Sequence, residues 1–204
     1  MCGMVQLPST IFMLPELSLM HVSKCEGLAL SEQEKCDKTV LKSSNVNHLV
    51  LSNCNISNDF LPIGLSFFFN VKDLNLSGNS FITLHAWIKE CHLLRNLKMD
   101  DCSRLREIIG IPRKLEKISV KGCISLNCLD LGVLPACTEQ SCFLKEMILD
   151  DCVCLREITW LPSNLDSFSA KGYTSLTSQI ISMLCNKVLS LWYHQLISMS
   201  KCCW

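Results

Sequence analysis

Residues 94–102 read LRNLKMDDC, and residues 144–152 read LKEMILDDC. In both stretches an apolar residue is followed by apolar residues three and five positions later, and by cysteine at the ninth position. The same spacing occurs seven times, with Cys, Asn or Tyr at the ninth position, which falls at Cys25, Cys54, Asn79, Cys102, Cys123, Cys152 and Tyr173. Successive ninth positions are 21 to 29 residues apart, as from Cys102 to Cys123 and from Cys123 to Cys152.

This spacing is the L-x-x-L-x-L-x-x-N/C signature of a leucine-rich repeat, whose period is about 20–29 residues. A longer duplication supports this assignment. Residues 100–126 and 150–176 have DDC, LREI, one proline, one leucine, KG and SL in common at an offset of 50. Each repeat supplies one short strand that buries its apolar face only by stacking on its neighbours. The sequence therefore predicts an α/β leucine-rich repeat solenoid of about seven repeats. Its concave face should carry a curved, parallel β-sheet, and its convex side should be irregular or formed by short helices.

The repeats predict a leucine-rich repeat domain over residues 1–176 and a C-terminal apolar tail over residues 177–204. Apolar residues recur at roughly helical spacing in this tail, which makes it a candidate capping helix. The stretches 26–44 and 127–141 break the repeat rhythm and are predicted to be projecting loops. On the convex side, residues 104–108 predict a short extended or single-turn segment, and residues 61–69 and 86–94 predict helices.

Alternation of side chains along a strand divides each repeat into core and exposed positions. In the fourth repeat, Leu97 and Met99 enter the core, whereas Asn96, Lys98 and Asp100 point outward on the concave sheet. The same offset in the middle repeats predicts a strip of mixed charge, which favours specificity over raw affinity. The predicted partner-binding surface consists of Lys98, Asp100, Lys117, Ser119, Lys121, Glu146 and Asp150.

The chain has 15 cysteines, but five of them occupy the ninth repeat position, where the side chain turns inward. A reduced cysteine there acts as a small hydrophobic side chain with a weak donor. Many periodic, unpaired cysteines favour a reducing compartment, and the N-terminal residues show no secretory signal. We therefore expect a cytoplasmic or nuclear protein.

The formal net charge is zero, so neither nucleic acid nor an anionic membrane surface is the expected partner. No run reaches the ~18 apolar residues of a membrane span. Cysteine and histidine lack the spacing of a zinc site, and no G-x-x-x-x-G-K-S/T phosphate loop is present. The acidic pairs at 100–101 and 150–151 have no nucleophile at a matching offset and are interpreted as a solvated edge. The sequence predicts neither an enzyme nor a bound cofactor or metal.

Three stretches carry a family resemblance: FLPIGLSFFFNVKDLNLSGNSF (60–81), WIKECHLLRNLKMDDCSRLREIIGIP (87–112) and LREITWLPSNLDSFSAKGYTSLTS (155–178). They resemble the C-terminal leucine-rich repeats of plant disease-resistance proteins of the Toll/interleukin-receptor nucleotide-binding class (TIR-NBS-LRR), in a legume-like form. The resemblance implies the recognition or regulatory module of an intracellular immune receptor. Its partners would be proteins: a pathogen effector, a guarded host protein or the receptor's own domains.

The chain shows neither a phosphate loop nor a Toll-type segment, so the resemblance predicts a truncated receptor without its nucleotide-binding and signalling domains. A different class is the substrate-recruiting repeat of an F-box ubiquitin ligase, which also uses cysteine at the ninth position. An F-box would need a helical segment of about 40 residues before the repeats, whereas 16 residues precede Leu17. The F-box ubiquitin ligase is therefore the second-ranked interpretation, after the immune receptor.

Overall fold

The computed structural model describes residues 3–8, 11, 14–30, 45–61, 65, 68–84, 86–131, 143–159, 161–162 and 165–172. The predicted C-terminal tail, the domain boundary at residue 176 and Tyr173 of the seventh repeat lie outside these residues.

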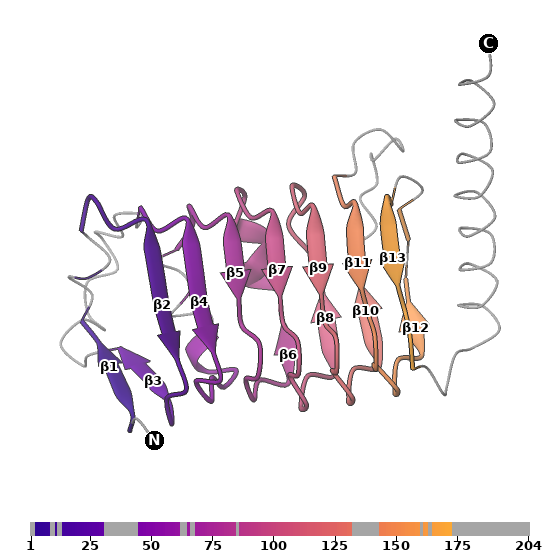
Figure 1. Cartoon of the computed structure of the whole chain (residues 1–204), viewed down its shortest axis with the longest axis horizontal. Helices are drawn as coiled ribbons and strands as arrows, with labels where there is room; N and C mark the ends of the chain where they lie inside the picture. The colour runs from indigo at the N-terminus through magenta and orange to yellow at the C-terminus, as the bar shows by residue number, and fades with distance from the viewer. Residues whose placement is uncertain are drawn as a thin grey trace, which may run out of the picture.

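Seven parallel strands form the main sheet of a solenoid (Figure 1). In space they run in the order β13-β11-β9-β7-β5-β4-β2. Their bounds are β2 (Leu19–Ser23), β4 (His48–Ser52), β5 (Asp73–Asn75), β7 (Asn96–Lys98), β9 (Lys117–Ser119), β11 (Glu146–Ile148) and β13 (Ser167–Ser169). Each strand lies at the L-x-L segment of one repeat, so the predicted leucine-rich repeat solenoid with its parallel sheet is confirmed.

The apolar positions of the repeat signature form the core. From the second repeat to the seventh, the residue that opens each signature is at most 2% exposed, as Val46 and Leu165 illustrate. A fully buried leucine or valine stabilises the fold by about 1.5–3 kcal/mol. At the two ends of the sheet, Val22 and Phe168 are only partly buried, because an end repeat has a neighbour on one side alone.

A second parallel sheet covers the back of repeats three to six (Figure 1). It runs in the order β12-β10-β8-β6, with bounds β6 (Thr83–Leu84), β8 (Glu107–Ile109), β10 (Cys128–Asp130) and β12 (Glu157–Ile158). The segment predicted to be extended at residues 104–108 thus ends inside β8. Nearer the N-terminus, β1 (Val5–Leu7) and β3 (Leu28–Leu30) form a parallel pair of their own.

Two stretches predicted to be loops contain strands, and that part of the prediction is wrong. Stretch 26–44 contains β3, and stretch 127–141 contains β10. A segment that runs beside a parallel neighbour finds in-register partners for its backbone N–H and C=O groups, so it forms a strand within a stretch that is otherwise polar. In β10 the central Leu129 is also fully buried. The remainders of both stretches, 31–44 and 132–141, lie outside the described residues.

The convex helix predicted over residues 86–94 is shorter and tighter than expected. A 3₁₀ helix, η4, spans Ala86–Glu90, and the Cys91 N–H continues its i to i+3 pattern by donating to the Ile88 carbonyl at 3.1 Å. The chain must place Leu94 in the core only a few residues later, which leaves too little length for an α-helix. The other predicted helix, over residues 61–69, falls mostly outside the described residues.

Side chains at the ninth position join successive repeats. Each Sγ or Nδ2 donates to the backbone carbonyl at the sixth position of the preceding repeat. The pairs are Cys54 to Val22 at 3.3 Å, Asn79 to Leu51 at 2.6 Å, Cys102 to Leu76 at 3.3 Å, Cys123 to Met99 at 3.0 Å and Cys152 to Val120 at 3.0 Å. The four cysteines are unpaired and fully buried, as predicted for this position. Burial raises the pKa of the Cys152 thiol to about 12.

Candidate functional site

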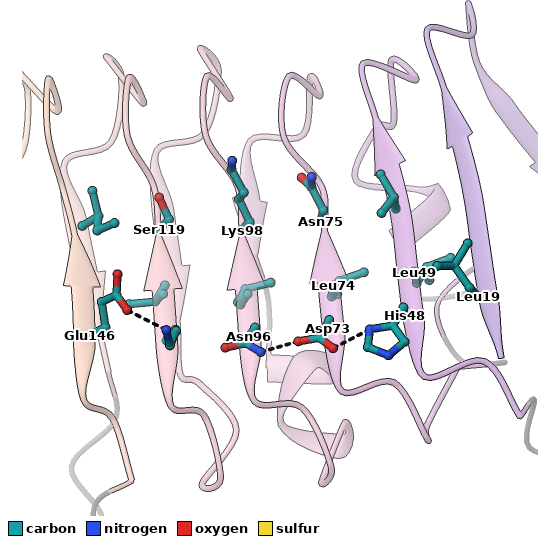
Figure 2. A pocket seen from close by; sticks show the side chains of 15 residues that line it. Leu19, His48, Leu49, Asp73, Leu74, Asn75, Asn96, Lys98, Ser119 and Glu146 are labelled. Atoms are coloured by element: carbon teal, nitrogen blue, oxygen red, sulfur yellow. Dashed lines mark hydrogen bonds and ion pairs between the residues drawn. The ribbon is translucent and has the colours of Figure 1, made fainter.

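An open groove runs across the concave sheet over its central strands (Figure 2). Its floor mixes polar with apolar side chains and comes from two rows of outward-facing residues that the parallel register sets side by side. The first row, at the strand starts, is Leu19, His48, Asp73, Asn96, Lys117 and Glu146, and the second is Val50, Asn75, Lys98, Ser119 and Ile148. Neighbouring strands lie about 4.8 Å apart, so each side chain can touch the next one in its row.

The polar members of the first row form two separate clusters. His48 Nδ1 lies 2.6 Å from Asp73 Oδ2, and Asn96 Nδ2 donates to Asp73 Oδ1, as the dashed lines of Figure 2 show. Further along, Lys117 Nζ lies 3.0 Å from Glu146 Oε2. The hydrogen bond to Glu146 raises the pKa of Lys117, and the charge of that carboxylate adds to the rise.

Four of the seven predicted site residues line this groove: Lys98, Lys117, Ser119 and Glu146. They come from three different repeats, so the structure brings together residues that the repeat offset had selected. The other three, Asp100, Lys121 and Asp150, lie just past the strand ends and outside the groove lining.

The two predicted aspartates hold the next repeat in place. Asp100 Oδ1 accepts hydrogen bonds from Ser119 Oγ at 2.5 Å and from the Lys121 N–H at 3.0 Å. One duplication later, Asp150 Oδ1 accepts from Ser169 Oγ at 2.7 Å and from the Lys171 N–H at 2.8 Å. The Ser169 and Lys171 hydrogen bonds lower the pKa of Asp150. These two carboxylates therefore link one repeat to the next by hydrogen bonds, whereas the sequence pattern predicts a solvated edge.

Sequence reasoning left His48, Asp73 and Asn96 out of the predicted site. The alternation rule had already placed them on the outer face, and the missing signal was their register with Lys117. They belong to the same row because each strand pairs with the next without a shift. The structure extends the mixed-charge strip by two repeats toward the N-terminus.

The groove offers hydrogen-bond donors, acceptors and both signs of charge on an open surface. Lys98 and Lys117 keep more than half of their side-chain surface exposed. Among the described residues, no group of three or more His, Cys, Asp or Glu side chains is placed to hold a metal ion. In the same part of the chain, no helix is long and apolar enough to cross a membrane. Exposed, mixed-charge side chains on a stack of repeats are suited to contact with another macromolecule.

Together, the parallel stack and its exposed concave face define a leucine-rich repeat protein. Residues 3–136 match the family described as "Disease resistance protein RPS4B-like, leucine-rich repeats". The chain belongs to this family.

Two curated relatives carry the same kind of name. TMV resistance protein N of Nicotiana glutinosa is 32% identical over 76 residues, which are 37% of this chain and 7% of that protein. The probable disease resistance protein At4g19520 of Arabidopsis thaliana is 31% identical over 87 residues, 41% of this chain and 5% of that protein. The matched part of the chain thus spans less than a tenth of either relative. No solved structure matches the chain.

Proposed function

We propose that this chain is the recognition and regulatory repeat module of an intracellular plant immune receptor. Its concave groove would contact a protein: a pathogen effector, a guarded host protein or the receptor's own domains. The contact residues of the proposal are Lys98, Lys117, Ser119 and Glu146, extended by His48, Asp73 and Asn96. The proposal involves no catalytic step and no bound cofactor, and it assigns the protein to the cytoplasm or nucleus.

One observation carries this proposal: a row of polar side chains stays in register across five strands of the sheet, with His48 and Lys117 exposed and Asp73, Asn96 and Glu146 partly buried. Nothing in the packing of the core needs these side chains, since the signature residues on the opposite face supply it. Exposed surface ion pairs contribute only about 0–1 kcal/mol to stability. A role in folding is therefore a weak explanation for the row, and a binding role is the stronger one. The family of disease resistance proteins supports the immune context.

The test is charge reversal in the groove of a full-length disease-resistance receptor that carries these repeats. The variant is Lys98→Glu with Lys117→Glu. The matched control is Arg104→Glu with Arg106→Glu, which makes the same change of charge at exposed positions outside the groove lining. Circular dichroism of both purified chains first establishes that the fold is retained.

The readout is cell death in leaf tissue with and without the pathogen. We expect the groove variant to lose the triggered response if the groove binds an effector or a guarded host protein. We expect pathogen-independent cell death if the groove holds the receptor's own domains. The control should behave like the wild type. A folded groove variant that responds like the wild type in both conditions would refute the proposal.

A further inference from the structure

A second surface lies along the edge where the strands of the main sheet begin, at the top of Figure 1. We call it the strand-start rim and define it by nine residues of repeats three to six: Phe69, Lys72, Leu93, Arg95, Arg113, Lys114, Glu116, Phe143 and Lys145. All are exposed except Glu116, which is partly buried. The exposed fraction reaches 36% for Phe69, 38% for Leu93 and 50% for Phe143.

Backbone hydrogen bonds align this rim. The N–H of Arg95 donates to the Lys72 carbonyl, the N–H of Glu116 to Arg95, and the N–H of Lys145 to Glu116, each at 2.8 Å. These four residues directly follow the buried residue that opens each repeat. Leu93, Lys114 and Phe143 directly precede the same buried residue. Seven of the nine rim residues therefore lie in two columns, one before and one after the buried residue of each repeat, and Phe69 and Arg113 stand one position earlier in the sequence.

The charge of these nine residues is mainly positive, and the same column continues in repeat seven with the exposed carboxylate of Asp166. The rim carries the five cations Lys72, Arg95, Arg113, Lys114 and Lys145 against the single carboxylate of Glu116, which pairs with Arg95 at 3.3 Å. Within the described residues, the other four cations have no ion-pair partner in the structure. The opposite edge, where the strands end, carries the acidic pairs of residues 100–101 and 150–151.

Exposed aromatic and aliphatic side chains interleave with these cations. Aromatic side chains and arginine are enriched in protein interfaces, whose rims are polar. We propose that the strand-start rim binds an acidic segment of a partner protein that carries apolar side chains among its carboxylates. Its carboxylates would pair with the cations, and its apolar side chains would cover Phe69, Leu93 and Phe143.

A protein segment fits this rim better than a membrane or a nucleic acid. The formal charge of the whole chain is zero, so the long-range field that draws a protein to those polyanions is weak. Central apolar anchors ringed by polar contacts are the usual source of affinity between proteins. The proposal does not depend on the concave groove, whose lining includes none of the nine rim residues.

The test measures fluorescence anisotropy of a labelled synthetic peptide in which Glu alternates with Leu and Phe, titrated with the full chain. The rim variant is Lys114→Glu with Lys145→Glu, and the matched control is Lys121→Glu with Lys171→Glu on the opposite edge. Two comparison peptides replace Glu by Lys, or Leu and Phe by Ser. Vesicles of phosphatidylcholine with phosphatidylserine, and single-stranded polyuridylate, serve as competing probes.

The rim variant should bind the acidic peptide about tenfold more weakly, while the control changes little, since reversal of rim charges acts locally. Phe143→Ser should weaken binding by about fivefold through loss of an apolar anchor. Equal weakening by the rim variant and the control would mean non-specific attraction and would overturn the proposal. So would tighter binding to the vesicles or to the RNA than to the peptide. Groove variants should leave this binding intact, which separates its failure from that of the proposed function.

Discussion

Asn79 is the buried hydrogen-bonding centre of the third repeat, and its removal should destabilise the fold strongly. It is 2% exposed and the one buried polar or charged side chain of the described residues. Its Nδ2 donates to the carbonyls of Leu51 at 2.6 Å and Leu76 at 2.7 Å. Its Oδ1 accepts from the N–H groups of Cys54 and Ile56, both at 3.0 Å. One amide thus satisfies four backbone groups from two repeats.

Asn79→Ala removes the side-chain partner of the Leu51 carbonyl and of the Cys54 and Ile56 N–H groups, whereas the Leu76 carbonyl still accepts from Cys102 Sγ. Each orphaned buried group costs about 1–3 kcal/mol, and a water molecule in the vacated space recovers part of that cost. We therefore expect the free energy of unfolding to fall by about 3–5 kcal/mol. Asn79→Cys keeps a donor for the Leu51 carbonyl, as cysteine does in the other repeats, but accepts poorly from the two N–H groups. Its cost should be about half as large.

Urea unfolding followed by far-ultraviolet circular dichroism measures both variants against the wild-type chain. A solenoid's stability is close to a sum of local and nearest-neighbour terms, so a central defect weakens both flanking interfaces. The reasoning fails if Asn79→Ala costs less than about 1 kcal/mol, the net value of a single hydrogen bond. It also fails if the cysteine variant is as unstable as the alanine variant.

Three further predictions follow from the same geometry. The ninth-position thiols, Cys152 among them, should react slowly with a thiol reagent in the native chain and fast after denaturation; fast native labelling of all would contradict the buried column. Gly122→Ala should cost about 1–3 kcal/mol at its φ of 70°, whereas Gly27→Ala, whose added Cβ would meet only the Met4 side chain in ordinary contact at 3.9 Å, should change the melting temperature little. The lowered pKa of Asp150 contributes to the free energy of unfolding above about pH 4, and this contribution is lost as the pH falls through the folded-state pKa. Asp150→Asn should therefore make the free energy of unfolding fall less steeply between about pH 4 and lower pH. An unchanged pH dependence would argue against the Ser169 hydrogen bond as a stabilising contact.

The two duplicated units also share a structural feature at the second aspartate of each DD pair. In the described parts of the duplicated units, Asp101 at φ 57° and Asp151 at φ 62° are each followed one repeat later by a glycine, at φ 70° or 74°. The Asp101 Oδ1 atom lies 2.3 Å from the place of a Gly122 Cβ. Only glycine leaves room for this carboxylate, which explains why the KG phrase recurs with the DD phrase.

The candidate site was only partly predictable. Side-chain alternation correctly selected groove residues such as Lys98 and Ser119, because alternation is a local property of a strand. It also selected Asp100, whose carboxylate is occupied by the next repeat. Alternation states which way a side chain points but not which neighbour meets it. The partner of Asp100 is 19 residues away in sequence, and only the register between strands brings them together.

By itself, the sequence determined the repeat, the positions of the seven main-sheet strands, their parallel order and the burial of the ninth-position cysteines. These follow from the repeat signature, because its apolar residues, spaced three and five positions from the first, can be buried together with the ninth residue only when each strand stacks on its neighbours. The tertiary structure decided the second sheet on the back, the network from His48 to Asn96 and the cationic strand-start rim. Each of these joins residues from repeats that lie 21 to 29 positions apart. Their contacts depend on how the intervening segments set the register, and no local pattern encodes that.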